Sequence, residues 1–143
     1  MCYTETIYAN TYYAQSILVA DGTYKGYFWL ILTSGSHPCA YVQIPKSYPF
    51  YHLVKKAVKT YYTGAAQSKN FEAFVRRIKA HGGITCVDTD ICGREGLYIG
   101  WDYAHYPQDY VSIYPDGQKK WTTEEIEAEV KSVVNQLIAI GQE

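Results

Sequence analysis

The sequence predicts an α+β fold in which a mostly antiparallel β-sheet carries helices on one face, including a C-terminal helix at about residues 122–140. Three observations predict it. Strand-like segments occur in both halves of the chain, amphipathic helical stripes lie between and after them, and a capping box opens the last helix. The 143 residues fit a single domain spanning 1–143, which can bury a core without metals or disulfides.

Three strand-like segments lie in the first half of the chain. The first is 14–20, and Asp21-Gly22 after it is a turn signal. The second, 23–33, is rich in aromatic and β-branched residues. The third, 39–45, follows a five-residue loop, so we expect these two to form an antiparallel hairpin.

The segment 39–45 also alternates, which indicates a strand with two distinct faces. Its predicted faces are Cys39, Tyr41 and Gln43 on one side and Ala40, Val42 and Ile44 on the other. In the second half, 84–88 and 97–103 are two more predicted strands joined by a Gly-containing loop. The long loop that follows contains one further predicted short strand at 110–114.

Two apolar stripes at helical spacing predict helices between the two groups of strands. The first begins at Phe50 and ends near Gly64. The second covers 69–80, with Ser68 or Asn70 as its N-cap and Gly82-Gly83 as its stop. Together they form a basic helical insertion at about 50–80. The clearest helix is the last one, because Thr122 and Glu125 form a capping box ahead of a continuous apolar stripe.

Composition excludes several classes of protein. A hydrophobic fraction of 48% with 19% charged residues excludes intrinsic disorder. The longest apolar runs fall far short of the ~20 residues that a membrane span needs, and the N-terminus lacks the pattern of a signal peptide. We therefore expect a cytoplasmic protein without membrane contact. None of the four cysteines forms a CxxC pair, so we expect free thiols.

Charge and tyrosine content each leave two interpretations open. Residues 46–79 carry eight basic groups against one acidic group, whereas residues 80–143 carry four basic and eleven acidic groups. The basic segment is either a solvated helical surface or a patch that attracts anions. The 16 tyrosines either fill amphipathic strand positions or form a stacking or interface surface.

A polar cluster is predicted where the two later strands meet. His81 precedes 84–88, while Asp102, His105 and Asp109 follow or end 97–103. If the two strands pair antiparallel, these four side chains converge. Imidazole and carboxylate can bind a first-row metal or act as a metal-free acid–base or binding pair. Alternatively, they hold a long irregular segment in place by hydrogen bonds.

The same cluster resembles a family of small bacteriophage and prophage proteins. The family carries a C-G-Y-V-x-V-P strand, an H-G-G-L-T-Y segment and a G-F-D-x-A-H-x-x-D motif, and ends in a helix. The matching stretches are 39–45 (CAYVQIP), 81–85 (HGGIT) and 100–105 (GWDYAH) with Asp109. Ala40 replaces a glycine of the family, and one extra residue precedes Asp109.

This resemblance implies an accessory phage protein in the cytoplasm of an infected or lysogenic bacterial host. Many such proteins counter host defence by sequestering a nucleotide signal, by degrading it, or by occluding a host protein. His81, Asp102 and His105 are the site residues that the resemblance implies.

The first functional hypothesis is a non-enzymatic protein that sequesters a nucleotide-like anion, without a cofactor or bound metal. Basic side chains would neutralise phosphate, Trp101 and tyrosines would stack on a base, and the polar cluster would bind ribose or base edges. The residues assigned to this ligand are His81, Trp101, Asp102, His105, Lys55, Lys56, Lys59, Arg76 and Arg77. A homodimer is compatible with such a role.

Two alternatives remain. The first is a hydrolase of a phosphodiester or nucleotide that uses His81, Asp102, His105 and Asp109 as metal ligands or as an acid–base pair. The second is a protein–protein inhibitor of a host defence factor that binds through the tyrosine-rich surface.

Overall fold

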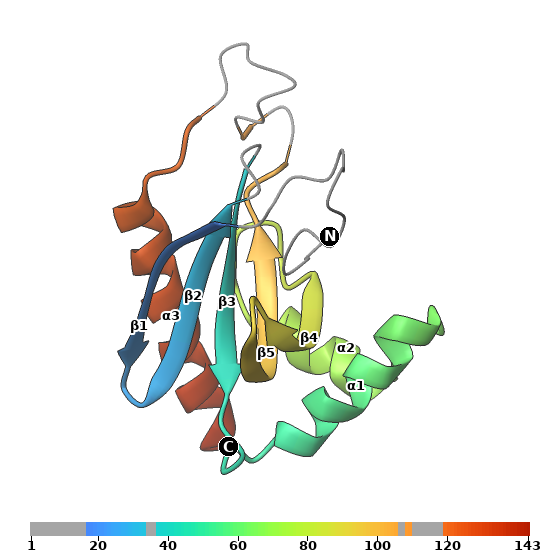
Figure 1. Cartoon of the computed structure of the whole chain (residues 1–143). Coiled ribbons are helices and arrows are strands. Elements are labelled where there is room, and N and C mark those ends of the chain that lie inside the picture. The colour runs from blue at the N-terminus through green and yellow to red at the C-terminus, as the bar shows by residue number, and fades with distance from the viewer. Residues whose placement is uncertain (1–16, 34–36, 106–107, 110–118) are drawn as a thin grey trace.

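The part of the chain that the structure describes folds into a five-stranded antiparallel sheet with the strand order β1-β2-β3-β5-β4 and three helices (Figure 1). The computed structural model describes residues 17–33, 37–105, 108–109 and 119–143. This architecture confirms the predicted α+β fold and its C-terminal helix. The elements are β1 (Ile17–Tyr24), β2 (Tyr27–Thr33), β3 (Pro38–Ile44), α1 (Tyr51–Thr63), α2 (Lys69–Arg76), β4 (Cys86–Ile91), β5 (Arg94–Asp102) and α3 (Thr123–Gly141).

The main core lies between the sheet and the helices. Ala40, Val42 and Ile44 of β3 point into it and pack with apolar side chains from all three helices, such as Phe74 of α2 and Val133 of α3. The predicted alternation of this strand is therefore confirmed, and the helices cover one face of the sheet. Burial of this apolar area is the dominant stabilising contribution to such a fold.

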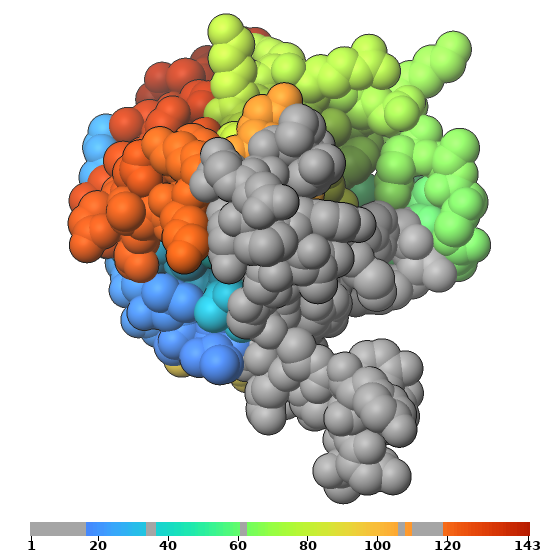
Figure 2. Space-filling view, turned by 90° about the horizontal axis from the view of Figure 1, so that it is seen from above, coloured from blue at the N-terminus to red at the C-terminus, as the bar shows by residue number. Residues whose placement is uncertain are grey.

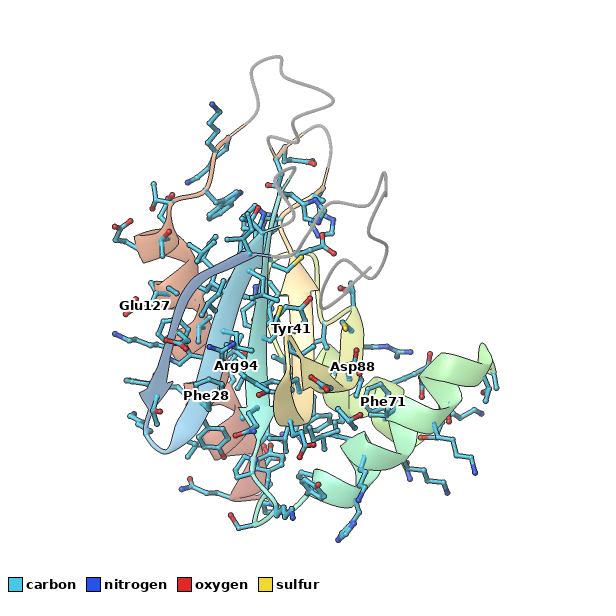
Figure 3. The ribbon with its side chains drawn as sticks, in the orientation of Figure 1. Phe28, Tyr41, Phe71, Asp88, Arg94 and Glu127 are labelled. Atoms are coloured by element: carbon cyan, nitrogen blue, oxygen red, sulfur yellow. The ribbon has the colours of Figure 1, made fainter. Side chains whose placement is uncertain are left out.

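The opposite face of the sheet is also buried at its centre. Cys39 and Tyr41 of β3 join a second apolar cluster there, and Phe28 of β2 packs against it. Arg94, at the start of β5, reaches Asp21 of β1 across this face, with 3.5 Å between guanidinium and carboxylate. Figure 3 shows Phe28, Tyr41 and Arg94 near one another on the sheet.

The first hairpin turns later than the sequence predicts. Asp21-Gly22 lies inside β1, and the turn is Lys25-Gly26, where both residues have positive φ (50° and 85°). Such a two-residue turn matches the natural twist of paired strands. Gly22 instead lies opposite Trp29, whose Cζ2 would be 2.8 Å from a Cβ at that position. The predicted strand 14–20 is thus part of a longer β1, and residues 14–16 lie outside the described residues.

The β4–β5 hairpin is longer and tighter than predicted. Its strands extend to Ile91 and from Arg94, so the Gly-containing loop reduces to Cys92-Gly93. The β2–β3 hairpin is present as predicted, with Ile31 opposite Ala40. The predicted strand at 110–114 lies outside the part of the chain that the structure describes.

The helices α1 and α2 form where the two apolar stripes predict them, but α2 is shorter than predicted. α1 ends at Thr63, directly before Gly64, as expected, and Ser68 caps α2 by accepting a hydrogen bond from the Phe71 N–H (3.1 Å). α2 ends at Arg76, with Arg77 as its C-cap, rather than near residue 80. Gly82-Gly83 therefore does not stop this helix.

Two other sequence predictions can be compared with the structure. Among the described cysteines, Cys39, Cys86 and Cys92, no disulfide is formed. Within the described ranges, no helix combines the length and the apolar character that crossing a membrane requires.

The capping box of α3 forms as predicted. The Thr122 hydroxyl accepts from the Glu125 N–H (3.2 Å), and the Glu125 carboxylate accepts from the Thr122 N–H (3.0 Å). We expect Thr122→Ala to lower the free energy of unfolding by about 1 kcal/mol, because the variant loses this N-cap. Denaturant unfolding would measure the change. Thr123→Ala, one residue later, is the control, and an equal loss there would contradict a capping role.

Candidate functional site

The polar cluster predicted from the sequence comes together at one end of the sheet. β4 and β5 pair antiparallel, so the segment before β4 meets the segment after β5. Nε2 of His81 lies 2.6 Å from Oδ2 of Asp109. Figure 2 looks onto this end of the molecule, where the yellow-green segment after α2 adjoins the orange residues after β5. The predicted convergence is confirmed, whereas the functional role of these residues stays a prediction.

Asp109 is the buried centre of the cluster, with 0% of its surface exposed. Its Oδ2 accepts from His81 and from the His105 backbone N–H (2.9 Å), and its Oδ1 accepts from the Trp121 indole (2.8 Å). Burial alone would raise the pKa of Asp109, but these hydrogen bonds outweigh it and hold the pKa below its usual value. Asp109 is therefore a fixed carboxylate that orients its neighbours.

The imidazole of His81 is held by aromatic rings as well as by Asp109. It stacks on Tyr103, with 4.8 Å between ring centroids and 6° between planes, and packs against Trp121 at 4.9 Å. The His105 ring approaches it at 5.2 Å. Because the ring is fixed on several sides, His81 is preorganised rather than a mobile surface side chain.

His105 lies directly over Gly82, which explains the glycine after His81. A Cβ on Gly82 would come within 1.9 Å of Nε2 of His105, and the φ of Gly82 is +70°. The same Nε2 atom is buried, makes no hydrogen bond to the residues that the structure describes, and faces Oδ1 of Asp102 at 3.5 Å. Asp102 also accepts from the Ala104 N–H (3.2 Å). The H-G-G and D-x-A-H segments are thus parts of one arrangement.

A second layer of side chains supports His81 from beneath. The Tyr103 hydroxyl accepts from the Trp101 indole (3.0 Å) and donates to the Glu129 carboxylate of α3. Burial and the hydrogen bond to Glu129 raise the pKa of Tyr103. Sequence reasoning missed Tyr103, Trp121 and Glu129 as part of the site. The aromatic residue within the GWDYAH segment was the available signal for the first of them.

One individual prediction about this region is wrong. Trp101 was expected to stack on a ligand, but it is fully buried and its indole is bound to Tyr103. His37 is half-buried beside the cluster. Burial lowers the pKa of His37, and the negative charges of Asp102 and Asp109 partly offset that effect.

The basic residues do not join this cluster. Arg77 pairs with Glu143, whereas Tyr103, on which His81 stacks, bonds Glu129. Glu129 lies in α3 and Glu143 lies two residues after its end, so the two are fourteen residues apart. At the rise of an α-helix this separation is about 20 Å. Lys55, Lys56 and Lys59 lie on α1, at the opposite end of the sheet in Figure 1, and Arg76 ends α2. The structure therefore does not bring these basic residues to the histidines, and the shared ligand site of the first hypothesis stays a prediction.

The chemistry available to the cluster is that of two imidazoles and a buried carboxylate. One donor atom from each of His81, His105 and Asp109 lies within 4.8 Å of the others. Such a set can transfer protons, or it can bind a divalent metal that polarises water.

Asp109 also gives the stability of the fold a pH dependence. Because its folded pKa lies below the unfolded value of about 4, its charged form stabilises the fold above that pH. This contribution is lost as the pH falls through the folded pKa. We expect the free energy of unfolding of chelator-treated protein to decline below about pH 4, and to decline less steeply in Asp109→Asn. Denaturant titrations over a pH series would measure both slopes, and equal slopes would contradict the assignment.

Comparison with known proteins gives no match to a family model, to a curated protein or to a solved structure. The resemblance to the phage family therefore stays a prediction that depends on the residues quoted above. What the site offers must be judged from its own geometry.

Proposed function

We propose that this protein is a hydrolase of a phosphodiester or nucleotide and that its water is activated at His81, His105 and Asp109. The observation that carries the proposal is the convergence of these three side chains around a buried, hydrogen-bonded carboxylate. These groups offer two routes to an activated water, namely proton abstraction by an imidazole and coordination to a metal ion.

The surroundings of the cluster favour an anionic substrate. Lys119 lies beside Asp109, because the two residues form an isolated parallel β-bridge. Its ammonium lies 4.1 Å from the centroid of the Trp121 ring, which in turn bonds Asp109. A cation at this position, paired with Glu125 at the surface, would attract and orient a phosphate group.

The accessory phage role remains part of the proposal. The segments that carry the resemblance, 81–85 and 100–105 with Asp109, are the ones that meet in the cluster. Degrading a nucleotide signal would be one way for such a protein to counter host defence. Sequestration loses support relative to hydrolysis, because the basic residues it requires lie at a distance from the histidines.

The test is mass analysis of linear, cyclic and ADP-ribose-type nucleotides incubated with the purified protein, read before and after heat denaturation. New products before denaturation, lost in His81→Gln and kept in His52→Gln, would support the proposal. His52 is an exposed histidine on α1 and serves as the matched control. Intact nucleotide released only by heat would instead support sequestration. No depletion of any nucleotide would favour the protein–protein inhibitor.

A further inference from the structure

The three donor side chains of the cluster come from separate segments, yet their arrangement is close to that of a metal site. His81 follows α2, His105 follows β5, and Asp109 lies four residues further along. A tetrahedral ion with bonds of 2.0–2.2 Å would hold its donor atoms about 3.3–3.6 Å apart. The donor atoms here lie within 4.8 Å of one another, and the closest pair is 2.6 Å apart. Shifts of about 1 Å would therefore create a coordination sphere.

The hydrogen-bond pattern around Asp109 is also that of a ligand held by a second layer of donors. Trp121 and the His105 N–H fix its two oxygens independently of His81. A cation could replace the proton that Asp109 and His81 share and leave both of these bonds intact. Carboxylate ligands of metals are held by such outer hydrogen bonds. Among the residues that the structure describes, no Lys or Arg side chain forms an ion pair with Asp109.

His105 supplies an independent observation. Within the described ranges its buried Nε2 atom has no hydrogen-bond partner, which is costly for an imidazole nitrogen unless another group engages it. A bound ion would resolve this in one of two ways. It would bind Nε2 directly, or it would bind the other ring nitrogen while Nε2–H turns to Asp102, 3.5 Å away. A carboxylate behind a histidine is a common support of metal-bound imidazoles.

We propose that His81, His105 and Asp109 bind one divalent first-row transition metal ion, with Zn²⁺ as the representative ion. Two imidazoles and one carboxylate are a donor set for such ions and leave a fourth position open for water. The role of the ion in activating water rests on the proposed function, but its binding does not.

The test is metal binding by the whole chain after treatment with a chelator. Protein is dialysed against Zn²⁺, and metal per chain is counted by elemental analysis for wild type, His81→Gln and the control His52→Gln. We expect one ion per chain for wild type and the control, and an affinity at least about tenfold weaker for His81→Gln. Zn²⁺ should also raise the melting temperature of wild type and of the control but not that of His81→Gln.

Co²⁺ substitution identifies the donor atoms, because thiolate and imidazole ligands give different absorption spectra. A thiolate-to-cobalt charge-transfer band would place the ion on a cysteine and overturn the assignment. Folded wild type that retains no Zn²⁺, or His81→Gln that binds as wild type does, would also overturn it. Turnover that survives metal removal would support the hydrolase but would show that its activity does not need the ion. One bound ion without turnover would support the metal site and contradict the proposed hydrolase.

Discussion

Tyr103→Phe is expected to lower the free energy of unfolding by about 2–3 kcal/mol, although it removes a single oxygen atom. The hydroxyl of Tyr103 accepts from the Trp101 indole and donates to Glu129. Trp101 is fully buried, so its N–H would remain without a partner in the variant. An unsatisfied buried donor costs about 1–3 kcal/mol, and the lost bond to a charged carboxylate adds to that cost.

Tyr98 of β5 provides a matched control. It is also buried, but within the described residues its hydroxyl has no hydrogen-bond partner. Tyr98→Phe removes this unpaired polar group, so the variant should be as stable as wild type or more stable. Denaturant unfolding of both variants would measure the difference. Similar losses for the two would show that the Tyr103 network does not stabilise the fold.

Local patterns predicted much of this fold because they report local physics. The alternation of Ala40, Val42 and Ile44 reflects which face of β3 meets the helices, and the Thr122 capping box acts within one helical turn. The prediction of the first turn was wrong because the chain has two candidate turns, Asp21-Gly22 and Lys25-Gly26. Lys25-Gly26 forms the turn, which leaves Gly22 opposite Trp29, and this pairing depends on the partner strand.

The site was predictable only in part for the same reason. Antiparallel pairing of β4 and β5 was enough to bring His81 to Asp109. The contributions of Trp121 and Glu129 depend on how α3 docks against the sheet, which no local pattern encodes. Arg77 is only four residues from His81 in sequence. The segment between them nevertheless runs along α3, with Lys79 bonded to Gln136, and so separates their side chains.

Gly82→Ala should be the most damaging small substitution near the site. Positive φ costs a non-glycine residue about 1–2 kcal/mol. A Cβ at Gly82 would also lie 1.9 Å from Nε2 of His105, so the ring must move. Forcing an extra methyl into a packed site costs about 1–3 kcal/mol more. We therefore expect a loss of about 3–4 kcal/mol in the free energy of unfolding.

Gly83→Ala isolates the part of this loss that belongs to His105. Gly83 also has positive φ (+81°), but a Cβ there meets nothing within 4 Å. The strain of the backbone and the lower entropy of the unfolded chain are shared by both variants, so they cancel in the comparison. The remaining difference in free energy of unfolding between the two variants reports the contact with His105. We expect Gly82→Ala, but not Gly83→Ala, to lose Zn²⁺ binding as well. Equal stability and equal metal binding in the two variants would mean that His105 does not depend on Gly82 for its position. In that case the glycine after His81 would serve the turn and not the site.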